Sequence, residues 1–456
     1  MGHAELAEMQ LRDEAWKYAL ALAAKYGDWR NRKSAINSVS KCDVGLVMRL
    51  EALARKVNAR FDSEKLLNVA NVRVMGDRDQ HCEVHIDEIK DPKRRMYFDF
   101  GLRIEHSTMS KKSNLHSGEE VVERLRQDYA GVADLFEQEY GISLAAYCDG
   151  MLGLIRLMRA RAKVQWQKVA LDDDGYVDFE TNKTFAALSE AMYFTDSELS
   201  QALRPVFVSY MRRHSFDGNE LSDEELRFNY VTRRPFLIGR GFFILSQELI
   251  FDSLFDNVHF TLLEGAEAKD RYKAHRSVQF VDEIAQLAAS AGYAEVARDV
   301  DLTEGKRKLG DIDVILSNAE TGHTLLVEAK NHALPLPVYF GSPEALDAHV
   351  ARTREWEQKV LRRIDHLRGD SPSFSPPGQW DYVIVSNMPE PLAHVSTLLI
   401  LSAEEFASWI ENESRPKLFA DFYRSFYKPD EANMSEDEIF RLMDEGFVLA
   451  RPTVGL

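Results

Sequence analysis

The chain has 456 residues, with 57 Lys and Arg against 74 Asp and Glu, so its formal charge is -17. This length predicts two to four domains, and a composition of 45% apolar and 29% charged residues excludes wholesale disorder. The acidic total disfavours a protein that coats nucleic acid by charge alone. No apolar run approaches the ~18 residues that cross a bilayer, and the N-terminal pattern is not that of a secretion signal. We therefore expect a cytoplasmic protein with no membrane partner.

Helical periodicity dominates the N-terminal part of the chain. The predicted helices cover residues 13–27, 44–61, 121–141, 143–162 and 197–214. Alternating segments at 81–89 and 94–104 are predicted as strands, and an apolar hairpin at 234–246 has its turn at Gly239-Arg240-Gly241. This pattern predicts a mostly helical domain over 1–165 and a mixed α/β connecting region over 166–265.

From residue 274 the predicted elements follow the order α-β-β-β-α-β. They are an amphipathic helix, three strands, a long helix and a last strand, at 274–292, 295–302, 309–318, 323–331, 343–369 and 381–388. Because the elements are close together in sequence, we expect one sheet with helices on both sides. This α/β domain is assigned to 266–410 and a helical tail to 411–456.

Two of these strands carry acidic and basic side chains at alternate positions, in GDIDVIL and VEAK. Alternate residues of a strand share a face, so Asp311 lies beside Asp313 and Glu328 beside Lys330. A tight hairpin about Glu320-Thr321 would place Asp313 opposite Glu328, with Cβ atoms about 5 Å apart. Two facing carboxylates repel each other unless they share a cation, and Mg²⁺ suits such oxygen ligands. The pattern thus predicts a metal site, in which Asp311 competes with Asp313.

The helix before these strands offers a third carboxylate. At 100° per residue, Glu283 falls on the border of the apolar face formed by Phe280, Ile284 and Leu287, whereas Asp282 falls on the solvent side. Glu283 is therefore expected to lean over the edge of the sheet.

Basic side chains accompany the same region. Arg352, Lys359 and Arg363 border the apolar stripe of the long helix, and Lys306-Arg307-Lys308 form a second cluster. Such groups can bind the phosphate backbone of a nucleic acid. By itself, a basic stripe of this kind is more often a solvated edge than a phosphate-binding site. The prediction therefore depends on its joint occurrence with the acidic residues.

With these residues in this order, the segment resembles the PD-(D/E)xK nuclease superfamily, and GDIDVIL with VEAKN looks most like Mrr-type restriction enzymes and archaeal Holliday-junction resolvases. Gly310 stands where the family pattern has proline. The resemblance implies Asp313, Glu328 and Lys330 as the catalytic triad. Asp313 and Glu328, with the carbonyl oxygen of Ala329, would hold Mg²⁺ or Mn²⁺, Lys330 would orient the attacking water, and Glu283 would bind the metal or a water.

The resemblance implies a metal-dependent endonuclease that cleaves DNA, with defence against foreign DNA as the expected role. Two alternatives remain: a non-catalytic protein that keeps the nuclease fold and binds nucleic acid or a partner, and an enzyme that cleaves RNA. The N-terminal region would then act as a sensor, a specificity module, a protein-binding module or an oligomerisation module.

Overall fold

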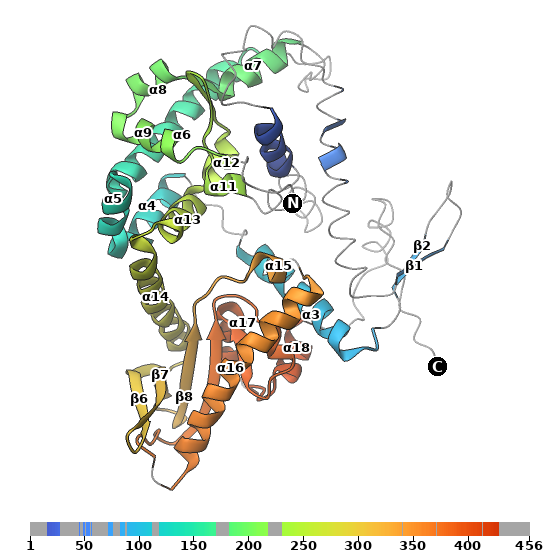
Figure 1. Cartoon of the computed structure of the whole chain (residues 1–456), viewed down its shortest axis with the longest axis vertical. Helices are drawn as coiled ribbons and strands as arrows, with labels where there is room; N and C mark the ends of the chain where they lie inside the picture. Colours follow the sequence, from blue (N-terminus) through green and yellow to red (C-terminus); the bar gives the residue numbers. More distant parts are fainter. Residues whose placement is uncertain are drawn as a thin grey trace. The chain divides into compact units, whose positions relative to one another are not determined.

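The computed structural model describes residues 16–27, short pieces between 45 and 86, and 89–111, 118–169, 182–217, 230–339, 341–370, 372–412 and 414–427. The chain divides into two compact units (Figure 1). The first comprises Met1–Phe61 and Leu115–His275, and the second comprises Asp62–Asn114 and Arg276–Leu456. We expected domains that are contiguous in sequence, but each unit combines two segments of the chain. Residues 62–114 belong with the C-terminal part, and residues 166–265 belong with the helices before them.

The described part of the first unit is mainly helical. Residues 16–26 form a helix, as expected for 13–27. The later helices are α4 (Gly118–Asp128), α5 (Ala133–Tyr140), α6 (Leu144–Trp166), α7 (Asn182–Met192), α8 (Asp196–Ala202), α9 (Pro205–Arg213), α11 (Tyr230–Arg233), α12 (Gln247–Asp252) and α13 (Leu254–Glu264). A small antiparallel sheet joins β3 (Tyr193–Thr195), β5 (Phe242–Ile244) and β4 (Leu237–Gly239) in that order. The predicted hairpin is confirmed, with Gly239 paired to Phe242 across the turn.

The second unit is built on a five-stranded mixed sheet in the order β10-β9-β8-β7-β6. Its strands are β6 (Ala294–Glu304), β7 (Arg307–Asn318), β8 (His323–Lys330), β9 (Gln379–Ser386) and β10 (Leu399–Ser402). β6, β7 and β8 pair antiparallel, whereas β8, β9 and β10 pair parallel. The predicted α-β-β-β-α-β order is therefore confirmed as a mixed α/β arrangement, to which β10 adds an unpredicted edge strand.

Two long helices flank this sheet. α14 (Ala268–Ser290) buries Phe280, Ile284 and Ala288 in the core, which is the apolar face expected for it. α16 (Pro343–Arg368) buries Val360, Ile364 and Leu367 and runs alongside β8 (Figure 1). Successive residues of the three central strands are buried and mostly aliphatic, so both faces of the sheet are covered.

Further elements complete the second unit. They are β1 (Val72–Met75), β2 (Glu83–Ile86), α3 (Pro92–Lys111), α15 (Leu336–Tyr339), the 3₁₀ helix η4 (Pro391–His394), α17 (Ala403–Glu411) and α18 (Phe419–Tyr427). The strand expected at 81–89 is present as β2, paired antiparallel with β1. The helix expected at 44–61 lies mostly outside the described residues, as does the tail beyond Tyr427.

One predicted strand is wrong, because residues 94–104 lie within helix α3. Asp91 accepts a hydrogen bond from the backbone N–H of Lys93, and Pro92 opens the helix. Tyr97, Phe100 and Ile104 are buried at helical spacing, and this burial outweighs the weak alternation of apolar and polar residues.

The helices expected at 121–141 and 197–214 are each interrupted. The first breaks into α4, a 3₁₀ turn (Ala130–Val132) and α5, and the second into α8 and α9 at Pro205. Proline lacks the N–H that a helix interior needs, so it opens the second helix instead. In the described part of the chain, no single helix has both the length and the apolar character needed to cross a membrane, although the bent pair Ala130–Tyr140 and Leu144–Trp166 meets these criteria jointly.

Candidate active site

The site predicted from VEAK lies where β7 and β8 part. The ladder between these strands runs from Asn318 paired with His323 to Val314 paired with Val327, which is the expected register. Asp313 and Glu328 follow directly after the last pair. There the Oδ2 atom of Asp313 accepts a hydrogen bond from the backbone N–H of Ala329 at 2.6 Å, so a carboxylate takes the place of the next ladder carbonyl.

Three aspartates converge at this point. Carboxylate oxygens of Asp299, Asp311 and Asp313 all lie within 4.8 Å of one another, and together they could hold a metal ion. Asp311 and Asp313 therefore both belong to the group. Asp299 comes from β6, where its φ of 49° interrupts the ladder between the pairs made by Arg298 and Val300.

Asp299 was not predicted, because its position depends on a β-bulge. Near the β6–β7 turn Thr303 pairs with Lys308, but the next pair is Leu302 with Gly310, so β7 contains one extra residue. Without this extra residue Asp299 would face Ile312, whose side chain is in the core. The irregular register instead brings Asp299 to the face of the sheet that carries Asp313.

The carboxyl group of Asp313 lies in an unfavourable environment for a negative charge. Burial and the nearby carboxylate of Glu328 raise its pKa from 3.8 to about 6, against the opposing effects of the Ala329 N–H and the Lys330 ammonium. Crowded, partly desolvated carboxylates of this kind are typical of cation sites and of catalytic acids and bases.

Glu328 is almost fully buried and is held by three donors. Its Oε2 atom forms an ion pair with Arg363 and lies 3.3 Å from the hydroxyl of Tyr382. Its Oε1 atom accepts a hydrogen bond from Nζ of Lys330 at 2.6 Å. The Lys330 ammonium also lies 5.9 Å from the ring centroid of Trp356. Glu328 and Trp356 therefore fix the position of Lys330.

The adjacent acidic residues Asp282 and Glu283 of α14 are arranged differently from the prediction. Asp282 does not point freely to solvent, because it forms an ion pair of 2.6 Å with Arg298 on β6. Glu283 is exposed and is not a member of the aspartate group. The apolar face of the helix is as expected, but Glu283 at its border is not among the carboxylates that converge at the site.

The predicted row of basic residues on α16 is split. Arg363 is buried and paired with Glu328, so it is not part of a surface that contacts phosphates. Arg352 and Lys359 are exposed, with Arg352 2.9 Å from Nδ1 of His349 and Lys359 3.6 Å from Glu355.

The second basic cluster occupies the turn between β6 and β7. Lys306, Arg307 and Lys308 are all exposed there. Lys308 forms an ion pair with Asp301 at 2.6 Å, so Lys306 and Arg307 provide most of the positive charge that this turn can offer to an anion.

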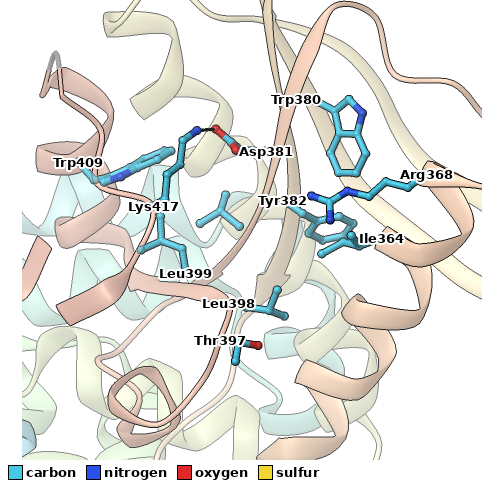
Figure 2. A pocket seen from close by; sticks show the side chains of 11 residues that line it. Ile364, Arg368, Trp380, Asp381, Tyr382, Thr397, Leu398, Leu399, Trp409 and Lys417 are labelled. Carbon is cyan, nitrogen blue, oxygen red and sulfur yellow. Dashed lines mark hydrogen bonds and ion pairs between the residues drawn. The ribbon is translucent and has the colours of Figure 1, made fainter. Parts of the chain in front are cut away.

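A cavity of about 180 Å³ has Tyr382, whose hydroxyl contacts Glu328, in its wall (Figure 2). Its wall includes Trp380 and Trp409, and the guanidinium of Arg368 lies 5.5 Å from the Trp380 ring centroid. Lys417 points across the cavity to Asp381, with which it is paired. Since Lys417 and Asp381 are already paired, and no group of carboxylates converges there among the described residues, the aspartate site is the stronger candidate for chemistry.

The chain matches no protein-family model, no curated protein and no solved structure. The functional assignment therefore depends on the geometry of these residues and on the chemistry they support.

Proposed function

We propose that this protein is a metal-dependent nuclease that hydrolyses phosphodiester bonds, with DNA as its expected substrate. One observation carries the proposal: Asp313, Glu328 and Lys330 meet where β7 and β8 part, beside Asp299 and Asp311. A cluster of carboxylates next to an oriented ammonium is the arrangement that phosphodiester hydrolysis needs.

The donor set fits Mg²⁺ or Mn²⁺. Three aspartate carboxylates offer hard oxygen ligands within 4.8 Å of one another. The raised pKa of Asp313 reflects charge repulsion and burial that a cation would relieve. When bound, such an ion lowers the pKa of a coordinated water and offsets charge on the phosphate.

The residues of the chain then have separate tasks. Asp313, with Asp299 and Asp311, holds the cation, and the carbonyl oxygen of Ala329 is the further ligand expected from the motif. Lys330, positioned by Glu328, donates to the attacking water and to the oxygens of the pentavalent phosphorus. Glu328 is already held by Arg363, Tyr382 and Lys330, so we assign it first to orienting Lys330.

The exposed cations provide for substrate binding. Arg352 and Lys359 on α16, and Lys306 and Arg307 at the β6–β7 turn, are available to backbone phosphates, which position a nucleic acid without reading its sequence. The resemblance to the PD-(D/E)xK nucleases supports this assignment, and a role in defence against foreign DNA depends on that resemblance alone.

Cleavage assays test the proposal directly. Supercoiled plasmid, linear duplex DNA and an RNA of the same sequence are incubated with the protein in Mg²⁺, Mn²⁺ or EDTA. We expect metal-dependent cutting of DNA that falls at least about 100-fold in Asp313→Ala and in Lys330→Ala. Calorimetry should show that Asp313→Ala also loses metal binding, whereas Lys330→Ala retains it.

Glu320→Ala is the matched control, because Glu320 is exposed in the turn of the β7–β8 hairpin and lies outside the aspartate group. It should cut like the wild type. Cutting that survives both Asp313→Ala and Lys330→Ala would refute the site. Preferential cutting of the RNA would show that RNA, not DNA, is the substrate.

A second candidate is favoured by the surroundings of Glu328. Its carboxylate is fully engaged by Arg363, Tyr382 and Lys330, as expected of a nuclease fold that has become a non-catalytic binding protein. Nucleic-acid binding without cutting in any metal, together with no metal binding by calorimetry, would support this alternative over the nuclease.

A further inference from the structure

The polar face of the site continues beyond Lys330 to His332. The backbone N–H of Asn387 donates to the carbonyl of Lys330 at 3.2 Å, and the Asn387 side chain accepts from the N–H of His332 at 3.3 Å. Asn387 thus holds the chain extended after β8 ends. Because alternate residues of an extended chain share a face, Glu328, Lys330 and His332 form one row.

Each member of this row contacts α16. Glu328 pairs with Arg363, Lys330 lies against the ring of Trp356, and the ring of His332 stacks on that of His349 at 5.9 Å and 15°. The three partners on α16 are spaced two helical turns apart, so they form one stripe along the helix. His332 therefore occupies a built position in the same face as Lys330.

Glu390 determines which nitrogen of His332 is available. Its carboxylate is fully buried, with Oε1 2.6 Å from Nε2 of His332 and Oε2 2.9 Å from Nε2 of His349. Burial alone would raise the pKa of Glu390, but hydrogen bonds from the two histidines hold it below its usual value. The carboxylate is therefore ionised and accepts a hydrogen bond from the Nε2–H group of each ring.

The two histidines nevertheless differ. Arg352 can only donate, so its contact of 2.9 Å with Nδ1 of His349 fixes that ring as the neutral tautomer with its proton on Nε2. His332 has no such neighbour on Nδ1 among the described residues, and its side chain is 27% exposed. His332 can therefore take up a second proton and present an Nδ1–H group outward.

We propose that His332, as an imidazolium, and Arg352 form a second phosphate-binding subsite next to the phosphate at Lys330, which makes nucleic-acid binding weaken as pH rises. The proposal rests on the proposed function and names a regulating contact for the same substrate. His332 lies two residues beyond Lys330, about 7 Å along an extended chain, which matches the step from one backbone phosphate to the next.

The charged groups around His332 account for the direction of the pH effect. Glu390, from the loop before η4, favours the protonated ring, whereas Lys330 on β8 and Arg352 on α16 oppose it. The contact with Arg352 places the proton of the His349 ring on Nε2. A histidine ring gains positive charge as pH falls, so a phosphate contact made by His332 should weaken as pH rises.

The test is fluorescence anisotropy with a short labelled DNA duplex in EDTA, over a salt series at about pH 6 and about pH 8. Each phosphate contact adds about 0.9 to the slope of log affinity against log salt on duplex DNA. The wild type should lose about 0.9 of slope between the two pH values. His332→Ala and His332→Gln should show, at both pH values, the smaller slope that the wild type has at the higher pH. His332→Arg carries a permanent charge and should show, at both pH values, the larger slope that the wild type has at the lower pH.

Arg352→Ala should lower the slope by a similar amount at both pH values, because arginine stays charged. The matched control is His323→Ala, since His323 is also on β8 and also pairs with a carboxylate, Asp381 at 3.0 Å, but lies at the opposite end of the strand. It should keep the pH dependence of the wild type.

The subsite is overturned if His332→Gln keeps the pH-dependent slope, if His332→Arg follows the alanine variant while remaining folded by circular dichroism, or if the duplex does not bind at any pH. Binding in EDTA does not depend on turnover. The expected salt slopes without any cleavage would support the subsite and contradict the nuclease proposal. Cleavage without these slopes would support the nuclease and contradict the subsite.

Discussion

Asp313 shows how a functional carboxylate can oppose the stability of the fold around it. Its pKa is raised to about 6 by burial and by Glu328, so the folded chain holds this proton more tightly than the unfolded chain does. The contribution of protonated Asp313 to the free energy of unfolding is fully present below about pH 3.8 and is lost as pH rises through about 6. At neutral pH the ionised group therefore destabilises the protein, as is common at sites shaped for ligands.

Asp313→Asn should consequently raise the free energy of unfolding by roughly 1–3 kcal/mol at about pH 7.5 in EDTA. Asparagine removes the charge, yet its side-chain oxygen can still accept from the N–H of Ala329. Urea unfolding at about pH 7.5 and about pH 4 measures the effect, which should nearly vanish at the lower value. Added Mn²⁺ should stabilise the wild type and not the variant; a less stable variant at neutral pH would contradict this account.

At the scale of elements, the bulge in β7 sets the composition of the site. Gly310 follows the extra residue and has a φ of 122°, which side chains rarely adopt. A Cβ atom there would lie 2.8 Å from Cζ of Arg363, the residue that neutralises Glu328. The same glycine thus permits the bulge that brings Asp299 to Asp313 and the close approach of Arg363 to the strand. Its place directly before Asp311 therefore has a structural reason.

Gly310→Ala should destabilise the second unit by about 2–4 kcal/mol, because the backbone is strained and the Arg363 guanidinium must move away from Glu328. Gly305→Ala is the matched control: it lies in the same hairpin with a φ of 60°, but its Cβ would meet nothing within 4 Å. It should lose only about 1 kcal/mol from the backbone. Thermal unfolding of both variants measures the difference, and equal losses would mean that the contact with Arg363 contributes nothing.

At the scale of the molecule, the sheet unit depends on a segment far away in sequence. Arg103 of α3 is fully buried and forms a bidentate pair with the equally buried Glu405 of α17, at 2.7 and 2.8 Å, across 302 positions of the chain. Arg103 also donates to the carbonyl of Glu390, the residue that holds His332. Residues 62–114 are therefore part of the sheet unit and connect indirectly to the candidate site.

Arg103→Ala should lower the free energy of unfolding of this unit by roughly 3–5 kcal/mol, because it leaves the buried carboxylate of Glu405 without its partner. Arg424→Ala, which breaks an exposed pair with Asp421 on α18, should change it by less than about 1 kcal/mol. Thermal or urea unfolding of the full chain compares the two variants. Similar effects would show that the long-range pair is not needed for the unit.

Local patterns predicted the elements of the second unit well, because each is written in contiguous sequence. The apolar face of α14, the stripe of α16 and the register of the β7–β8 hairpin follow from helical spacing and from one short turn. For the same reason the alternation of two adjacent strands is enough to place Asp313, Glu328 and Lys330 together. The strand predicted at 94–104 failed because its burial partners, among them residues of α15 and α16, lie more than two hundred positions away.

Local sequence therefore specifies the order of elements around the sheet and brings Asp313 close to Glu328 and Lys330. Three further features arise only from long-range folding: Asp299 completes the aspartate group, Arg363 is buried against Glu328 instead of facing solvent, and residues 62–114 join the sheet. The physical reason is common to all three. Each depends on a contact between distant segments or on a one-residue bulge, and neither leaves a periodic signal in the local sequence.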